Sequence, residues 1–281
     1  MNISQNISFK VSIRLLVVIA GFATVSNTYA QLNYPVDVAV SGDDILVADL
    51  KLPGIQKISK DGGLSVVYKG TSKFRTPLNG VRCVVTNPEG KIVVGDSATR
   101  QIYIIEGGKP KPLLTNKIGI GVPYAMVYDQ KGNLFVADLE QPGRIFKVPA
   151  GKTVPEVFAV ESGVRGLAID KNGDLIAVTG QADALVKFAA DGKKSVILGN
   201  RPFRFPNSVA VKGDDIFVCD SYKKCVWKID SAGKATEFCK SGITYPGGLA
   251  VQGDNLLVTD SKSKKIFSIS ADGTAKEVPI K

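Results

Sequence analysis

The sequence of 281 residues contains no histidine. Without an imidazole, the chain can build no histidine general base, no histidine-ligated metal site and no Ser-His-Asp triad. Long hydrophobic runs are absent too. The longest run, Leu15–Ala23, has about nine apolar residues, whereas a membrane-spanning helix needs roughly 20. We therefore expect no membrane span in this protein.

The N-terminus has the composition of an export signal. Two basic residues, Lys10 and Arg14, precede the apolar run, and small residues follow it up to Ala30. This order predicts a secretory signal peptide over residues 1–30, cleaved after Ala30. No cysteine follows the run to accept a lipid. Residues 31–281 are thus expected to form a single mature domain that is periplasmic or secreted.

A short sequence pattern occurs six times along the rest of the chain. Its copies are YPVDVAV…DDILVAD, NGVRCVV…GKIVVGD, VPYAMVY…GNLFVAD, GVRGLAI…GDLIAVT, FPNSVAV…DDIFVCD and YPGGLAV…DNLLVTD. Equivalent positions lie about 40–45 residues apart, a period typical of propellers and solenoids.

Each repeat divides into four short apolar runs separated by turn residues, the pattern of closely spaced antiparallel strands. In the fifth repeat these runs are Ser208–Val211, Asp215–Asp220, Cys225–Asp230 and Ala235–Cys239. Six four-stranded sheets can bury their apolar faces only against one another. The sequence therefore predicts an all-β, six-bladed β-propeller of four-stranded antiparallel blades, with an open β-solenoid as the rival.

All six blades can form from contiguous sequence, because the chain ends on a natural fourth strand, AKEVPI. Ring closure would then depend on packing between the first and last blades. The alternative is that Gln31–Tyr34 adds an edge strand.

Two of the repeats carry a recognisable signature. The segments GNLFVADLEQPGRIFKV and DDIFVCDSYKKCVWKI resemble NHL repeats, and the openings FPNSVAV and YPGGLAV resemble the senescence-marker-protein/gluconolactonase group. The resemblance covers all six repeats and implies the propeller fold. It implies little about activity, because the relatives include lactonases, lyases, synthases and binding modules.

The gluconolactonase resemblance implies a divalent cation, such as Ca²⁺, bound by Glu, Asn and Asp at the channel mouth. Asn207 matches the asparagine, but Val36 and Gly247 stand where the two acids are expected. Asp37, next to Val36, is the other candidate metal ligand. Hard cations need several oxygen ligands, so we expect no cofactor, with a divalent cation at Asp37 and Asn207 as the alternative.

The start of each first strand should surround the channel mouth. The residues aligned there are Val36, Val81, Tyr124, Arg165, Asn207 and Gly247, with Asp37 and Arg82 at the next position. Tyr124, Arg165, Asn207, Asp37 and Arg82 are therefore the candidate ligand-binding residues. Asp residues end five of the six second strands, where we expect them to accept backbone N–H groups of the following turn.

Charge is distributed unevenly between the two faces of the predicted ring. Basic residues dominate the turns between strands two and three and the connections between blades, and acidic ones, such as Asp43 and Asp254, dominate the opposite turns. The candidate anion-binding residues are Arg75, Arg100, Arg144, Arg204, Lys223, Lys224 and Lys264. Such a field attracts anions, and arginine makes bidentate contacts to them. The alternative is that these loops only keep the protein in solution.

The four cysteines would occur in an exported chain, where disulfides can form. Cys219, Cys225 and Cys239 fall on successive strands of the fifth blade. One disulfide within that blade is expected, with Cys225–Cys239 slightly favoured over Cys219–Cys225, and three free buried thiols are the alternative.

Two functions of different classes remain open. The first is an exported, monomeric binding module whose basic face takes an anionic ligand, a glycan or an acidic protein; export argues against nucleic acid. The second is a histidine-independent hydrolase resembling the gluconolactonases, with a rearranged or incomplete metal site. The sequence favours the first, because two of the three expected metal ligands are missing.

Overall fold

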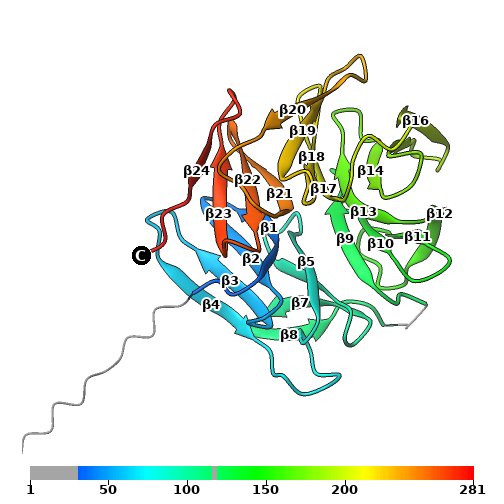
Figure 1. The fold of residues 1–281 in the computed structure, drawn as a ribbon. Helices are drawn as coiled ribbons and strands as arrows, with labels where there is room; N and C mark the ends of the chain where they lie inside the picture. The colour runs from blue at the N-terminus through cyan, green and yellow to red at the C-terminus, as the bar shows by residue number, and fades with distance from the viewer. Residues whose placement is uncertain (1–30, 116–118) are drawn as a thin grey trace, which may run out of the picture.

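The computed structural model describes residues 31–115 and 119–281, and the predicted signal peptide lies outside these ranges. Within them the chain is all-β, and its 24 strands form six sheets of four strands each. The sheets follow one another around a central axis (Figure 1). No helix in these ranges is long and apolar enough to cross a membrane.

The strands of the first three blades are β1 (Pro35–Ser41), β2 (Asp44–Asp49), β3 (Gly54–Ile58), β4 (Leu64–Lys69), β5 (Val81–Thr86), β6 (Ile92–Asp96), β7 (Gln101–Glu106), β8 (Lys109–Pro112), β9 (Pro123–Tyr128), β10 (Leu134–Asp138), β11 (Arg144–Val148) and β12 (Glu156–Val160). Those of the last three are β13 (Val164–Ile169), β14 (Leu175–Thr179), β15 (Leu185–Phe188), β16 (Lys194–Leu198), β17 (Pro206–Lys212), β18 (Asp215–Asp220), β19 (Cys225–Ile229), β20 (Ala235–Cys239), β21 (Pro246–Gln252), β22 (Asn255–Asp260), β23 (Lys265–Ile269) and β24 (Ala275–Glu277).

Every blade is an antiparallel sheet of four consecutive strands, so the predicted six-bladed propeller is confirmed. The first strands β1, β5, β9, β13, β17 and β21 each contact the first strand of the next blade, and β21 returns to β1. The predicted bounds of β18 and β20 agree with the structure, whereas β17 begins two residues earlier than expected, at Pro206.

The core is divided among the six seams of the ring. Six clusters of buried apolar side chains each lie between two neighbouring blades. The second strands β10 and β14 are buried along their whole length, because a neighbouring blade covers each of their faces. This explains why these strands are continuous apolar runs, while the outer fourth strands are largely exposed.

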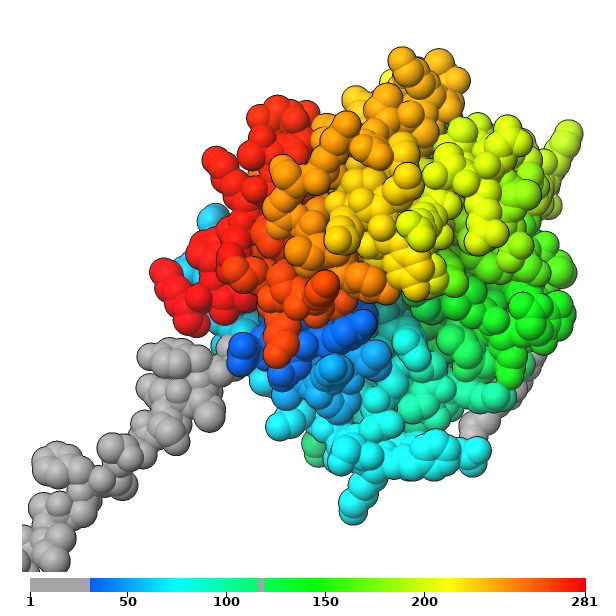
Figure 2. Space-filling model, viewed as in Figure 1, coloured from blue at the N-terminus to red at the C-terminus, as the bar shows by residue number. Residues whose placement is uncertain are grey.

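The ring closes by packing, as the contiguous repeats predict. Val47 and Ile58 of the first blade pack with Leu257 and Ile266 of the last, and Leu32 joins the same cluster. The first blade, in blue, and the last, in orange and red, adjoin in Figure 2. Residues 31–34 form no strand, so the alternative of an added edge strand is not observed.

The aspartates that end five second strands hold the loops above them. Asp49, for example, accepts the backbone N–H groups of Asn33 (2.6 Å) and Tyr34 (3.0 Å) from the segment before β1. It also accepts those of Lys51 (3.0 Å) and Leu52 (2.9 Å) from the following turn. Asp96, Asp138, Asp220 and Asp260 have corresponding contacts. The expected structural role is therefore confirmed, and it extends to the connection that precedes each blade.

The seam between the last and first blades leaves no room for a side chain at Gly248. A Cβ atom there would lie 2.5 Å from the Cα and the Oδ1 of Asp37. We expect Gly248→Ala to lower the free energy of unfolding by about 2 kcal/mol, because overpacking forces the backbone to move. Urea denaturation measures the loss. Gly199→Ala is the matched control, since a Cβ at Gly199 meets nothing within 4 Å, and an equal loss in both variants would contradict this explanation.

Candidate functional site: the mouth of the channel

A cavity of about 590 Å³ runs along the axis, and the first strands of all six blades line it. At its mouth, each first strand carries a one-residue bulge beside the end of the second strand. The bulged residues are Val36, Arg82, Tyr124, Arg165, Asn207 and Gly247, and all six line the cavity.

The predicted alignment of the second blade was wrong by one residue. Val81 was expected at the mouth, but it pairs with Asp96 and its side chain is fully buried. Arg82 occupies the bulge instead, and Cys83 takes the position equivalent to Asp37. A bulge adds one residue to a strand and redirects its side chains. An alignment based on apolar runs does not reveal this extra residue.

Cationic side chains belong to one half of the mouth. Arg82 of the second blade donates from Nε to Ser97 Oγ at 3.1 Å. Arg165 of the fourth blade lies over the ring of Phe205, with its guanidinium carbon 4.1 Å from the ring centre. In the described part of the chain, no carboxylate forms an ion pair with either arginine. Both guanidinium groups therefore keep donors for a ligand.

Tyr124 lies on the third blade between these two arginines. Burial raises the pKa of its phenol, while Arg165 and Arg82 act in the opposite direction. The phenol therefore stays protonated at neutral pH and can donate a hydrogen bond into the cavity.

Aromatic side chains form the other half of the mouth. Tyr34, Phe205 and Tyr245 belong to the first, fifth and sixth blades, which are neighbours in the ring, and all three line the cavity. Each stands directly before the proline that begins a first strand. The strand-end aspartate of its own blade accepts its backbone N–H, at 2.9–3.0 Å. Sequence analysis did not identify this aromatic wall, although the dipeptides YP, FP and YP mark it.

Asp37 lies deeper than the mouth, beside Gly248. Its Oδ2 accepts the backbone N–H of Val84 at 2.9 Å, across the seam to the second blade. Burial raises the pKa of this carboxyl to about 7, against the lowering effect of the N–H groups of Val84 and Val38. Its side chain nevertheless lines the cavity, so water in the channel retains some access to it.

Asn207 and Asp37 do not make a gluconolactonase-type metal site. The amide nitrogen of Asn207 donates to Ser221 Oγ and to the carbonyl oxygen of Pro246. Among the described residues lining the cavity, Asp37 is the only carboxylate, and these residues include no group of three His, Cys, Asp or Glu that could hold a metal ion. A hard cation needs more oxygen ligands than this mouth offers, so the residues present do not fit one.

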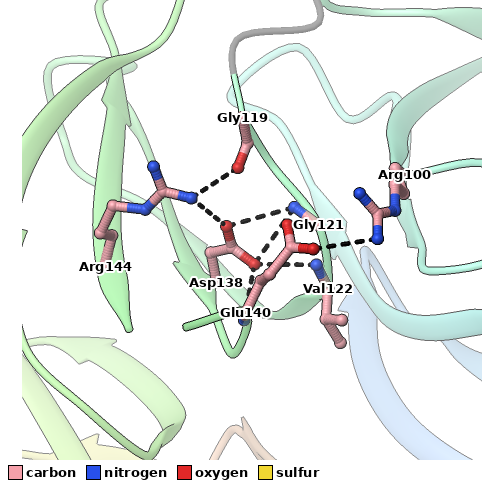
Figure 3. A network of polar contacts seen from close by, with 7 residues as sticks. All are labelled: Arg100, Gly119, Gly121, Val122, Asp138, Glu140 and Arg144. Carbon is pink, nitrogen blue, oxygen red and sulfur yellow. Dashed lines mark hydrogen bonds and ion pairs between the residues drawn. The ribbon is translucent and has the colours of Figure 1, made fainter. Parts of the chain in front are cut away.

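Two of the predicted anion-binding arginines contact carboxylates of their own chain (Figure 3). Nη2 of Arg100 lies 2.9 Å from Oε1 of Glu140. Nη2 of Arg144 lies 3.2 Å from Oδ2 of Asp138 and donates to the carbonyl oxygen of Gly119 at 2.7 Å. Both arginines therefore stabilise loops of the third blade.

The other predicted anion-binding residues form no ion pair with any residue that the structure describes. They are Arg75, Arg204, Lys223, Lys224 and Lys264, and all are exposed. On the opposite face, the five prominent aspartates each pair with a lysine: Asp43, Asp44, Asp214, Asp215 and Asp254. In the described part of the chain, these five aspartates are therefore each paired with a lysine, whereas the five cations of the mouth face have no carboxylate partner.

The predicted Cys225–Cys239 disulfide is wrong: the four cysteines are free and buried. Asp220 pairs with Cys225, and Val226 pairs with Cys239. Successive residues of a strand point to opposite faces, so Cys225 and Cys239 lie on different faces of the sheet. Cys219 shares a face with Cys239, but β19 lies between their strands, and a disulfide does not span that distance.

The NHL repeat family model matches residues 203–229, which include β18 and β19. No curated protein matches the sequence. Known structures share the fold. One is virginiamycin B lyase from Staphylococcus aureus, with 18% identity, a TM-score of 0.68, and coverage of 89% of this chain and 86% of that one. A variant of that lyase with histidine replaced by alanine is described as catalytically inactive.

Two further structures come from other bacteria. A gluconolactonase from Xanthomonas campestris has 15% identity and a TM-score of 0.70, with coverage of 83% of this chain and 85% of that one. An auxiliary nutrient binding protein from Bacteroides thetaiotaomicron has 14% identity and a TM-score of 0.67, with coverage of 84% and 68%. Identities this low establish the fold alone. The chain is a six-bladed propeller with an NHL repeat in its fifth blade, and its structural neighbours include gluconolactonase-like propellers.

Proposed function

We propose that this protein is a ligand-binding propeller that takes an organic anion at the mouth of its channel. The observation that carries the proposal is the pair of guanidinium groups, Arg82 and Arg165, that face one cavity without a carboxylate partner in the described chain. Buried or half-buried arginines are ordinarily paired, so a site that leaves two of them available suits a carboxylate, sulfate or phosphate.

One half of the mouth is cationic and the other is aromatic. We therefore expect the ligand to be an anion that carries a ring. Arg82, Tyr124 and Arg165 supply donors from three consecutive blades, and Tyr34, Phe205 and Tyr245 supply flat apolar surfaces opposite. A ligand with an anionic group at one end and a ring at the other would contact both halves at once. The arginines would fix its orientation, and the aromatic wall would provide the buried area.

Backbone strain on the same face supports a role in binding. Among the described non-glycine residues, seven have positive φ, and five of these are Arg75, Arg100, Arg201, Lys224 and Lys264. Left-handed backbone conformations cost about 1 kcal/mol for such residues. Strain of this kind concentrates at functional sites, and here it coincides with the cationic loops around the mouth.

Export to the periplasm or the medium belongs to the same proposal and is supported by the pattern of residues 1–30. A monomeric form is proposed with it. A nutrient-binding role, such as that named for the Bacteroides propeller, is consistent with it. A lyase reaction like that of the Staphylococcus enzyme is disfavoured, because this chain has no histidine. A lactonase reaction, the second candidate, is disfavoured because the described lining of the cavity includes one carboxylate as a metal ligand.

Calorimetry with two ring-bearing carboxylates, 4-hydroxybenzoate and galacturonate, tests the proposal. We expect at least one to bind, and Arg165→Gln to weaken its binding about tenfold or more, because a charge-assisted contact contributes roughly 1.5–3 kcal/mol. Binding should also fall as salt increases. The control is Lys131→Gln in an exposed turn of the opposite face.

The proposal fails if neither carboxylate binds, or if both bind equally well to the Arg165 and Lys131 variants. Hydrolysis of sugar lactones that EDTA abolishes would instead establish the second candidate.

A further inference from the structure

The aromatic wall of the mouth continues outward to the rim through a stacked pair. The rings of Phe205 and Tyr222 lie nearly parallel, with their centres 4.7 Å apart and an angle of 19° between them. Tyr222 is 52% exposed, and its ring centre is 6.4 Å from that of Tyr245. The inner end of this platform carries the guanidinium group of Arg165, at 4.1 Å from the Phe205 ring centre. An exposed platform of stacked rings therefore leads out of the cavity.

A second group of cations lies next to the platform residues in the chain. Arg204 immediately precedes Phe205 and Lys223 immediately follows Tyr222, and both line a shallow hollow with Arg201. None of the three cations pairs with a carboxylate in the ranges that the structure describes. Asp220 stabilises the backbone on both sides of this hollow, because it accepts the N–H groups of Arg204 and Lys223 at 2.7 and 3.1 Å. Cations therefore flank the platform: Arg165 lies on the ring of Phe205, and Arg204 and Lys223 are the residues next to Phe205 and Tyr222.

We propose that this path binds an acidic oligosaccharide, with one sugar acid in the mouth and the chain continuing over the platform to the rim. The inference rests on the proposed function and adds the class and length of the ligand. Pyranose rings present C–H faces that lie flat on aromatic rings and hydroxyl edges that take hydrogen bonds. Carboxylates repeated along the chain would meet Arg82 and Arg165 at one end and Arg204 and Lys223 at the other.

A saccharide chain suits this surface better than an acidic peptide does. Side chains of an acidic peptide carry charge but little flat apolar area, so they would leave Tyr222 and Tyr245 uncovered. Neutral oligosaccharides would cover the rings but would not use either cationic site. Only a ligand that combines rings with repeated anionic groups engages the whole path.

Calorimetry with galacturonate, tetragalacturonate, neutral cellotetraose and tetraglutamate tests this inference. We expect tetragalacturonate to bind about tenfold or more tightly than galacturonate, because two further charged contacts are formed. The double variant Arg204→Ala/Lys223→Ala should remove that gain while leaving galacturonate binding unchanged. Its matched control is Lys131→Ala/Lys234→Ala, which removes two charges from the opposite face. Tyr222→Ala should also weaken the tetramer selectively.

The outcomes separate this inference from the proposed function. If galacturonate and tetragalacturonate bind equally well and the rim variants change neither, the extended path is wrong and the anion site at the mouth stands. Equal or tighter binding of tetraglutamate or cellotetraose would overturn the choice of an acidic saccharide. If 4-hydroxybenzoate, galacturonate and the tetramer all fail to bind, the proposed function falls, and the inference falls with it.

Discussion

Replacing Asp220 with alanine is expected to lower the free energy of unfolding by about 3 kcal/mol, because several N–H groups lose their common acceptor. The carboxylate accepts from the backbone N–H groups of Arg204, Phe205 and Lys223 at 2.7–3.1 Å, and it is fully buried. Phe205 and Lys223 belong to the proposed binding path, so ligand affinity should fall together with stability. Urea denaturation followed by tryptophan fluorescence measures the first effect, since Trp227 also donates to Asp220.

The control for this variant is Asp254→Ala, whose side chain is fully exposed and pairs with Lys212 at 3.7 Å. It should change the stability by less than about 0.5 kcal/mol. Asp220→Asn keeps one acceptor oxygen and should fall between the two. If Asp220→Ala were as stable as the wild type, the strand-end aspartates would not be what holds the loops around the mouth.

The contribution of Asp37 to stability should decrease as the pH rises from about 4 to about 7. Its folded pKa is about 7, and the reference value is 3.8, so the folded state holds a proton that the unfolded state releases in this range. Unfolding therefore becomes easier with rising pH until the carboxyl also ionises in the folded state. Three pH units correspond to about 4 kcal/mol, which is an upper limit because Asp37 faces water in the channel.

Between pH 5 and 7 few other side chains titrate, because ordinary carboxyl groups titrate below this range and the chain has no histidine. Denaturation midpoints measured at pH 5, 6, 7 and 8 should fall and then level off above pH 7. In Asp37→Asn the decline between pH 5 and 7 should disappear, since the amide does not titrate. A decline of the same slope in that variant would assign the pH dependence to another group.

The fold could be predicted from the sequence because each repeat had to bury its own strands against a neighbour. Six copies of one apolar pattern predicted the number of blades. Turn residues, such as those of Lys212–Asp215, predicted the strand boundaries. The same reasoning predicted correctly that the strand-end aspartates accept backbone N–H groups. These features depend on local pattern and on period, both of which are visible in a single sequence.

The details of the mouth were harder to predict, because they depend on register. A bulge in β5 placed Arg82, and not Val81, at the mouth, and the register of β19 separated Cys225 from Cys239. A shift of one residue moves a side chain to the other face of a strand, and apolar pattern alone does not fix it there.

The number of charged residues in each set of turns predicted a basic face, but not which of its cations lack a carboxylate partner. Arg100 and Arg144 were predicted to bind anions, yet they contact Glu140 and Asp138 in the folded chain. These partners lie 40 and 6 residues away in the sequence, and only the ring geometry brings Arg100 of the second blade to Glu140 of the third. The aromatic wall was missed for a related reason: Tyr34, Phe205 and Tyr245 are neighbours only once the ring has closed.

A crystal structure of the full chain grown with galacturonate would show directly what the channel mouth binds. We expect the sugar in the channel mouth, with its carboxylate within hydrogen-bonding distance of Arg82 or Arg165 and its ring against Tyr34 or Tyr245. Galacturonate bound on the opposite face, or in the mouth with its carboxylate turned away from both arginines, would contradict this expectation.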